Sequence, residues 1–268
     1  MSMIATAAAL IPSTSRLDPA PLLPGFAQDG YAVLPQALPT PLLGRLREAF
    51  DRLMVGPIAA EPQSLQHQVN RVIERDPAFL ELIDLPSVFP LVRAIIGADV
   101  TLAAGGEAYS KRPHSPAFIS WHNDFQWMVD VPYPRQNFWV RATYFLDDID
   151  EDTAPMALLP GTHRADHECP ADLTGPDGQP RELPGMVRLT GKAGDCVVNH
   201  TEIWHTNTPN RGTRIRKLVM LTYKHAWMRQ WGDGHDIQVA FAETQTDPLR
   251  RQLCGLGDWH RCDRVWAT

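Results

Sequence analysis

A histidine and an aspartate two positions apart, His122 and Asp124, are the residues of this chain best suited to chemistry. Side chains at positions i and i+2 of an extended segment point to the same face, because strand side chains alternate. An imidazole and a carboxylate on one face can bind the same metal ion. His205 would complete a set of two histidines and one carboxylate, which leaves three positions of an octahedral metal open, as in non-heme Fe(II) oxygenases. Open positions are typical of a catalytic metal site.

The segment that follows His205 offers a cation for the same site. An apolar strand is expected at 195–199, and a second one at 215–224 contains Arg216. We expect these two strands to be antiparallel partners joined by a loop, with His205 near the metal and Arg216 deeper. A guanidinium stays charged when buried and can bind a carboxylate through two parallel hydrogen bonds. Arg216 could therefore hold the far end of a 2-oxo acid that chelates the metal.

The spacing alone leaves alternatives open. His200 competes with His205 for the position of third ligand, and Arg211 and Arg214 compete with Arg216 for the carboxylate. A lone His-x-Asp pair is also compatible with two polar residues on an exposed edge strand, since both residue types are usually found at the surface.

The order of several motifs resembles the phytanoyl-CoA dioxygenase family of Fe(II)/2-oxoglutarate-dependent oxygenases. The resemblance covers about residues 25 to 225. The motifs, in chain order, are Lys111-Arg112-Pro113, Trp121-His122-Asn123-Asp124, Leu146-Asp147-Asp148-Ile149-Asp150, Leu159-Pro160-Gly161-Thr162-His163-Arg164, and Trp204-His205 followed by Asn210 and Arg216.

The resemblance implies a role for each of these residues. His122, Asp124 and His205 would bind Fe(II), and Arg216 would bind the distal carboxylate of the cosubstrate 2-oxoglutarate. The implied reaction uses O2, releases succinate and CO2, and hydroxylates an unactivated C–H bond of a small organic metabolite. Desaturation, epimerisation or cyclisation on the same scaffold, and a non-catalytic jelly-roll binding protein, are the alternatives. Halogenation is disfavoured because Asp124 fills the position that a halide would need.

Further residues are candidates for lining the site. Thr143 and Asn207 could donate hydrogen bonds to the cosubstrate, although a packing role fits Thr143 equally well. Several aromatic residues near the motifs are expected to line an apolar pocket that keeps water from the reaction. These are Trp121, Phe125, Trp127, Phe138, Trp139 and Trp204.

The pattern of apolar residues predicts a mainly β protein with flanking helices. Its fold class, by the resemblance, is a double-stranded β-helix, a cupin-like jelly-roll, and strand-rich sequence with frequent turns agrees with it. Helices are expected at 24–30, at 41–54 with Thr40 as N-cap, at 78–83, at 88–96 and from Pro248 with Asp247 as N-cap. A loop is expected over 56–67. Strands are expected at 31–34, 100–112, 117–123, 137–146, 155–159, 185–190, 195–199 and 215–224.

Composition bounds the remaining properties. The 268 residues fit a single domain, with 1–20 as a flexible arm and 226–268 as a lid or an oligomer contact. A formal charge of −6 disfavours nucleic acid and anionic membranes as partners, and no apolar run is long enough to span a bilayer. The 4 cysteines are sparse, as expected for free thiols in the cytoplasm. The expected partners are a small-molecule substrate and O2, with a homo-oligomer possible.

Overall fold

Two antiparallel β-sheets form the body of the protein, as seen in a computed structural model that describes residues 16–125, 139–164, 172–230, 232 and 234–257. The larger sheet has the strand order β1-β8-β5-β10-β4-β2, with β3 also paired to β10, and the smaller sheet has the order β7-β6-β9. The strands are β1 Tyr31–Leu34, β2 Gln66–Asn70, β3 Val100–Leu102, β4 Glu107–Lys111, β5 Trp139–Phe145, β6 Met156–Leu158, β7 Val187–Leu189, β8 Cys196–His200, β9 His205–Asn207 and β10 Arg216–His225. The described part of the chain is therefore mainly antiparallel β, as the sequence predicts.

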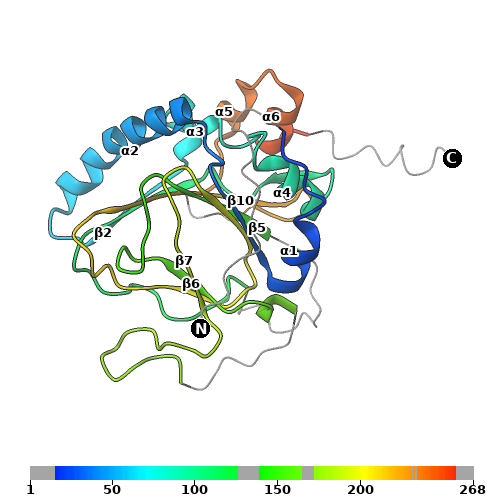
Figure 1. The fold of residues 1–268 in the computed structure, drawn as a ribbon. Coiled ribbons are helices and arrows are strands. Elements are labelled where there is room, and N and C mark those ends of the chain that lie inside the picture. The colour runs from blue at the N-terminus through cyan, green and yellow to red at the C-terminus, as the bar shows by residue number, and fades with distance from the viewer. Residues whose placement is uncertain (1–15, 126–138, 165–171, 231, 233, 258–268) are drawn as a thin grey trace.

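Helices cover the outer face of the larger sheet (Figure 1). They are α1 Leu23–Asp29, α2 Thr40–Ala60, α3 Pro77–Leu80, α4 Phe89–Ile96, α5 Val239–Glu243 and α6 Pro248–Leu253, with short 3-10 turns at Val72–Glu74 and Thr162–Arg164. Among these described helices, none is long and apolar enough to cross a membrane. At the N-terminal edge of the described chain, Leu17 is buried and its N–H donates to the Pro86 carbonyl at 3.0 Å.

Successive side chains of strand β10 point to opposite faces of the larger sheet. Val219, Leu221 and Tyr223 are fully buried in the core beneath the helices. The residues between them point to the other side, because strand side chains alternate. These line a cavity between the two sheets: Arg216, Leu218, Met220 and Thr222. Strand β5 alternates in the same way and presents Trp139, Arg141, Thr143 and Phe145 to the cavity.

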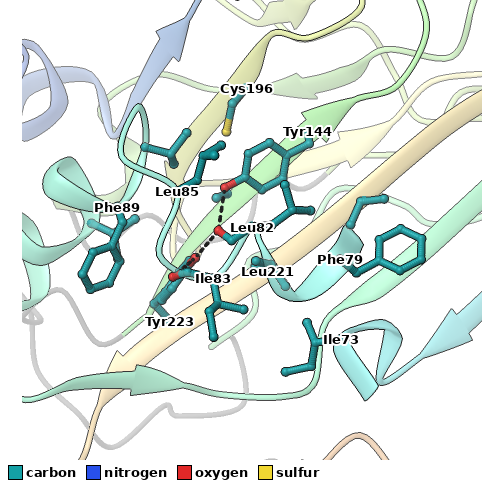
Figure 2. Close-up of a cluster of buried hydrophobic side chains, with 14 of the residues drawn as sticks. Ile73, Phe79, Leu82, Ile83, Leu85, Phe89, Tyr144, Cys196, Leu221 and Tyr223 are labelled. Atoms are coloured by element: carbon teal, nitrogen blue, oxygen red, sulfur yellow. Dashed lines mark hydrogen bonds between the residues drawn. The ribbon is translucent and has the colours of Figure 1, made fainter. Parts of the chain in front are cut away.

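In the core under the helices, two buried tyrosine hydroxyls are hydrogen-bonded to backbone carbonyls (Figure 2). The hydroxyl of Tyr223 donates to the Ile83 carbonyl at 3.0 Å, and that of Tyr144 donates to the Leu82 carbonyl at 3.3 Å. Both rings are fully buried. These bonds satisfy two hydroxyls that would otherwise be costly to bury, and they tie β5 and β10 to the segment that follows α3.

Several predicted elements differ from the structure. We expected helix α2 to end near Met54, but it continues through Pro57 to Ala60. The helix tolerates Pro57 because a proline in the exposed last turn removes only one backbone hydrogen bond. Thr40 is the first helical residue, not the N-cap. Residues 66–70 form strand β2, part of which was expected to be loop; its alternate residues are polar and face the cavity, so no apolar pattern marks it. The range 100–112 is two strands, β3 and β4.

The pairing of the strands around the site also differs from the prediction. Strands β8 and β10 are not partners, because β5 lies between them and pairs with both. The segment 117–123 is not a strand, and its backbone pairs with the smaller sheet through an isolated bridge between His122 and His205. The helix that begins at Pro248 is confirmed, with the Asp247 carboxylate accepting from the N–H of Arg250 at 2.9 Å.

Candidate metal centre

The structure brings His122, Asp124 and His205 together at one edge of the cavity. His122 and His205 exchange two backbone hydrogen bonds, of 3.0 and 2.8 Å, and the N–H of Asp124 donates to the Thr201 carbonyl at 3.0 Å. These bonds hold a segment without regular strand structure against the start of β9. One ligand atom from each of the three residues lies within 4.8 Å of the others.

Backbone carbonyls orient both imidazoles. The Nδ1 of His122 lies 2.9 Å from the Ser120 carbonyl, and the Nδ1 of His205 lies 2.8 Å from the Ile203 carbonyl. Because a carbonyl only accepts, Nδ1 is the donor in each ring, and Nε2 is the atom that a metal would bind. The Nε2 atoms lie 3.7 Å and 3.8 Å from the same oxygen, Oδ1 of Asp124. Three possible ligand atoms therefore lie together, as a divalent-metal site requires.

Arg141 of β5 holds the other oxygen of the aspartate. Its Nη2 donates to Oδ2 of Asp124 at 2.7 Å, and this leaves Oδ1 for a metal. Burial alone would raise the pKa of the Asp124 carboxyl, but Arg141, and then the two imidazoles, outweigh it, so this pKa lies below its usual range. Sequence reasoning missed Arg141. The available signal was a charged residue inside the apolar strand Trp139–Phe145.

Position separates the two histidines that competed for the third place, because both are buried but only His205 lies beside His122 and Asp124. Burial lowers the pKa of His205 to about 4, although the Asp124 carboxylate acts in the opposite direction, so the ring is neutral and able to bind a metal at neutral pH. His200 lies against the ring of His163, with centroids 5.1 Å apart, and its Nδ1 accepts from the N–H of Glu202. Burial, followed by His163, lowers the pKa of His200 to about 3. His200 therefore packs on His163 and is not grouped with His122 and Asp124.

The cavity beside the three residues has a volume of about 440 Å³ and contains Arg216, Thr143 and Asn207 in its wall. Arg216 donates to the Ala154 carbonyl at 2.9 Å, and its Nε has no hydrogen-bond partner among the described residues. Burial lowers its pKa to about 10, so the guanidinium stays charged at neutral pH. No carboxylate in the described part of the chain pairs with it. A buried cation without an anion fits an anionic ligand that enters the cavity.

The other cosubstrate candidates differ in how much of their hydrogen bonding is already used. The hydroxyl of Thr143 is buried and has no partner among the described residues. The amide oxygen of Asn207 accepts from the Lys111 ammonium at 3.3 Å and from the N–H of Phe118 at 3.1 Å. Lys111 is fully buried, and burial, followed by repulsion from Arg216, lowers its pKa to about 7.

The two arginines that competed with Arg216 lie elsewhere. Arg214 is half exposed and pairs with Asp150 at 2.6 Å, and Arg211 lines a smaller, separate hollow. Of the aromatic residues expected around the pocket, only Trp139 lines it within the described residues. Trp121 and Trp204 pack on Ala157 instead, and Phe125 packs edge-on against Trp139. Trp127 and Phe138 lie outside the described residues.

A jelly-roll that carries two imidazoles and one carboxylate beside a cavity, with a buried arginine in its wall, has the features of non-heme iron oxygenases that use a 2-oxo acid. The sequence model of the phytanoyl-CoA dioxygenase family matches residues 26–218, and the chain belongs to that family. It is thus a 2-oxoglutarate-dependent dioxygenase whose cofactor is iron and whose cosubstrate is 2-oxoglutarate.

Known relatives agree with this class. L-proline trans-4-hydroxylase of Streptomyces griseoviridis is 25% identical over 233 residues, which cover 76% of this chain and 87% of that protein. A probable alpha-ketoglutarate-dependent hypophosphite dioxygenase of Stutzerimonas stutzeri is 22% identical over 82% of this chain and 85% of its own length. In fold, the chain is similar to HygX of Streptomyces hygroscopicus, solved with nickel and 2-oxoglutarate bound, with a TM-score of 0.66 and 16% identity over 84% of this chain and 94% of that one.

Proposed function

We propose that His122, Asp124 and His205 hold Fe(II) and that Arg216 receives the distal carboxylate of 2-oxoglutarate, so that the enzyme hydroxylates a C–H bond of a small organic molecule. One observation carries the proposal: Nε2 of His122, Nε2 of His205 and Oδ1 of Asp124 lie close enough together to bind one metal ion, with the nitrogens 3.7 Å and 3.8 Å from the oxygen. The buried, unpaired guanidinium in the wall of the same cavity supports it, because a dicarboxylate that reaches from the metal would supply the missing anion.

The bound iron, with 2-oxoglutarate and O2, supplies oxidative decarboxylation to succinate and CO2 and an oxidant for an unactivated C–H bond. The chain's own residues bind and orient the reactants. Arg216 and the buried hydroxyl of Thr143 would fix the cosubstrate, with Asn207 as a weaker candidate whose amide nitrogen could donate while its oxygen accepts from Lys111. Phe145 and Leu218 belong to an apolar cluster that excludes water from this part of the cavity.

The substrate is proposed to be small. Its room is limited, because the cavity of about 440 Å³ must also hold the cosubstrate. The matched relatives are described as acting on small molecules, L-proline and hypophosphite. The cytoplasm remains the proposed location, in line with the free thiols of Cys196 and Cys254. A homo-oligomer and a closing role for 226–268 also remain predictions.

The test adds Fe(II) and 2-oxoglutarate to the protein without oxygen. We expect a visible metal-to-ligand charge-transfer band, and succinate release once O2 is admitted. Asp124→Ala should lose the band. Arg216→Ala should keep it but need far more 2-oxoglutarate, because the chelating end of the cosubstrate still reaches the metal.

Arg214→Ala is the matched control, since Arg214 lies two residues before Arg216 in the chain but pairs with Asp150 at the surface. It should behave as wild type. A wild-type protein without the band would refute the proposed function, and an unchanged requirement in Arg216→Ala would assign the distal carboxylate to another residue.

A further inference from the structure

The wall of the cavity changes from apolar to polar along the larger sheet. Around Phe145 and Leu218 it is apolar, with Ile149 and Leu189 closing it from the other side. Across β4 and β2 it is polar, and one residue of the C-terminal segment joins it there. These polar residues are Gln66, Gln68, Glu107, Tyr109 and His235. The apolar part suits the methylene groups of the cosubstrate, so the polar part is left for the substrate.

Glu107 is the charged residue of this polar wall. Among the described residues that line the cavity, it is the only carboxylate besides Asp124. Its side chain is 18% exposed, and no lysine or arginine of the described chain lies within 4.0 Å of it. It accepts from the hydroxyl of Tyr109 at 3.3 Å and from Nε2 of Gln68 at 3.4 Å, and Nδ1 of His235 lies 3.1 Å from its Oε1. These bonds leave part of its hydrogen-bonding capacity free, since a carboxylate offers about four acceptor sites.

The contacts around His235 hold this ring beside Glu107. Nε2 of Gln68 donates to Oδ1 of Asn70 at 2.7 Å, which orients the asparagine amide. The amide nitrogen of Asn70 then faces Nε2 of His235 at 3.4 Å, and Nδ1 on the other side of the ring lies 3.1 Å from Oε1 of Glu107. The carboxyl group of Glu107 is therefore held in place at the cavity wall.

Glu107 also lies near the metal centre. Its strand β4 pairs with β10, and Met220 is the partner both of Glu107 and of Thr143 on β5. Glu107, Arg141 and Asp124 line the same cavity. A ligand that touches Glu107 is thus close to the residues that surround the metal.

We propose that Glu107 determines substrate specificity by accepting a charge-assisted hydrogen bond from the protonated amine of a small molecule. The proposal rests on the proposed function of the metal centre. A ligand that fills the cavity removes water from the carboxylate. A neutral ligand would leave that charge poorly solvated, and an anionic one would be repelled, whereas an ammonium group compensates it.

The first test uses the anaerobic complex of the wild-type protein with Fe(II) and 2-oxoglutarate. The probes are the free proteinogenic amino acids and small aliphatic amines, each paired with its N-acetyl derivative. We expect at least one amine to perturb the charge-transfer band and stimulate succinate release, with its N-acetyl partner weaker by about tenfold or more, because a hydrogen bond to a charged group is lost. A response limited to uncharged compounds, or no response to any amine, overturns the proposal.

The second test uses variants with the best amine of that panel. Glu107→Gln should raise its KM by about tenfold or more and abolish the preference over the N-acetyl form. The KM for 2-oxoglutarate and the affinity for Fe(II) should stay within about twofold, because neither ligand contacts Glu107 in the proposed arrangement. Glu107→Asp keeps the charge and should retain the preference at reduced affinity.

Glu48→Gln is the matched control, because Glu48 is an exposed carboxylate of α2 far from the cavity. It should change neither KM. An undiminished amine preference in Glu107→Gln would refute the role of Glu107 while the band shows that the metal centre works. A wild-type protein without the band would refute the metal centre itself, so the two failures are distinct.

Discussion

The two faces of the larger sheet are built on opposite principles. On the helix side, β5 and β10 present apolar groups, and the hydroxyls of Tyr144 and Tyr223 are hydrogen-bonded. On the cavity side, the same strands present charges and unsatisfied groups: Nε of Arg216 and Oγ1 of Thr143 are buried without a partner among the described residues. The helix face therefore stabilises the fold, and the cavity face carries polar groups that a ligand could bind.

The difference has an energetic meaning. A buried donor without an acceptor costs about 1–3 kcal/mol, and a buried charge costs more. Such groups persist in a folded protein when the rest of the structure compensates for them and a ligand later satisfies them. The helix face supplies that compensation. Substitutions on the helix face should therefore reduce stability, whereas substitutions on the cavity face should reduce activity or ligand binding.

The largest effect is expected at the metal centre. His205→Ala removes one of the three converging donors, so iron binding and succinate release should fall below detection while the protein stays folded. His200→Ala removes a buried imidazole that faces His163, so it should lower the melting temperature and leave turnover per folded molecule near wild type. Iron titration, succinate release and thermal unfolding measure both. An active His205→Ala with an inactive His200→Ala would reassign the third ligand to His200.

A matched pair of leucines on β10 tests the two faces directly. Leu221 is fully buried under the helices, so Leu221→Ala should lower the free energy of unfolding by about 2–5 kcal/mol, with little change in KM for 2-oxoglutarate. Leu218 faces the cavity, so Leu218→Ala should cost less stability and raise that KM, because it widens the apolar part of the cavity. Urea unfolding and cosubstrate titration measure the pair. Equal stability losses with equal KM values would contradict the division between the faces.

Sequence alone predicted those parts of the site that leave a local pattern. His122 and Asp124 are two residues apart, and the long apolar run of β10 marked the strand that begins at Arg216. Strand β2 was missed because its cavity-facing residues, Gln66 and Gln68, are polar and interrupt the apolar alternation that identifies a strand.

Contacts between distant segments were beyond the sequence. Strands β8 and β10 were expected to be partners, but β5 is inserted between them, and no local signal records such an insertion. The same holds for Arg141 and Glu107. Each is a charged residue in a strand, and only the folded structure shows that one lies on Asp124 and the other on the cavity wall.

A smaller effect is expected at Arg141, which positions Asp124. Arg141→Gln removes the positive guanidinium group that donates to Oδ2 of Asp124. Affinity for Fe(II) should therefore fall by about 10–100-fold, as for other residues that orient metal ligands. KM for 2-oxoglutarate, measured at saturating iron, should change little. Arg214→Gln, at an exposed ion pair, is the control. Metal titration that shows equal affinity in Arg141→Gln and wild type would remove Arg141 from this role.

The smallest effect concerns Lys224, a lysine on β10 that is buried with its ammonium on the Met228 carbonyl. Burial lowers its pKa to about 8, against the opposing effect of Asp236, whereas an unfolded lysine has a pKa of about 10.4. Between these two values the unfolded chain binds more protons, so this residue makes the free energy of unfolding rise with pH in that window. Below the lower value its destabilising effect is constant.

Lys224→Met removes this dependence. The difference in the free energy of unfolding, wild type minus variant, should therefore be flat below about pH 8 and rise between pH 8 and about 10. The difference isolates Lys224, because Lys111, the buried tyrosines and Cys196 titrate equally in both proteins. Urea unfolding at several pH values measures it. If the difference in the free energy of unfolding stays flat up to about pH 10, the pKa of Lys224 is not lowered in the folded protein. The buried ammonium group of Lys224 would then not destabilise the fold.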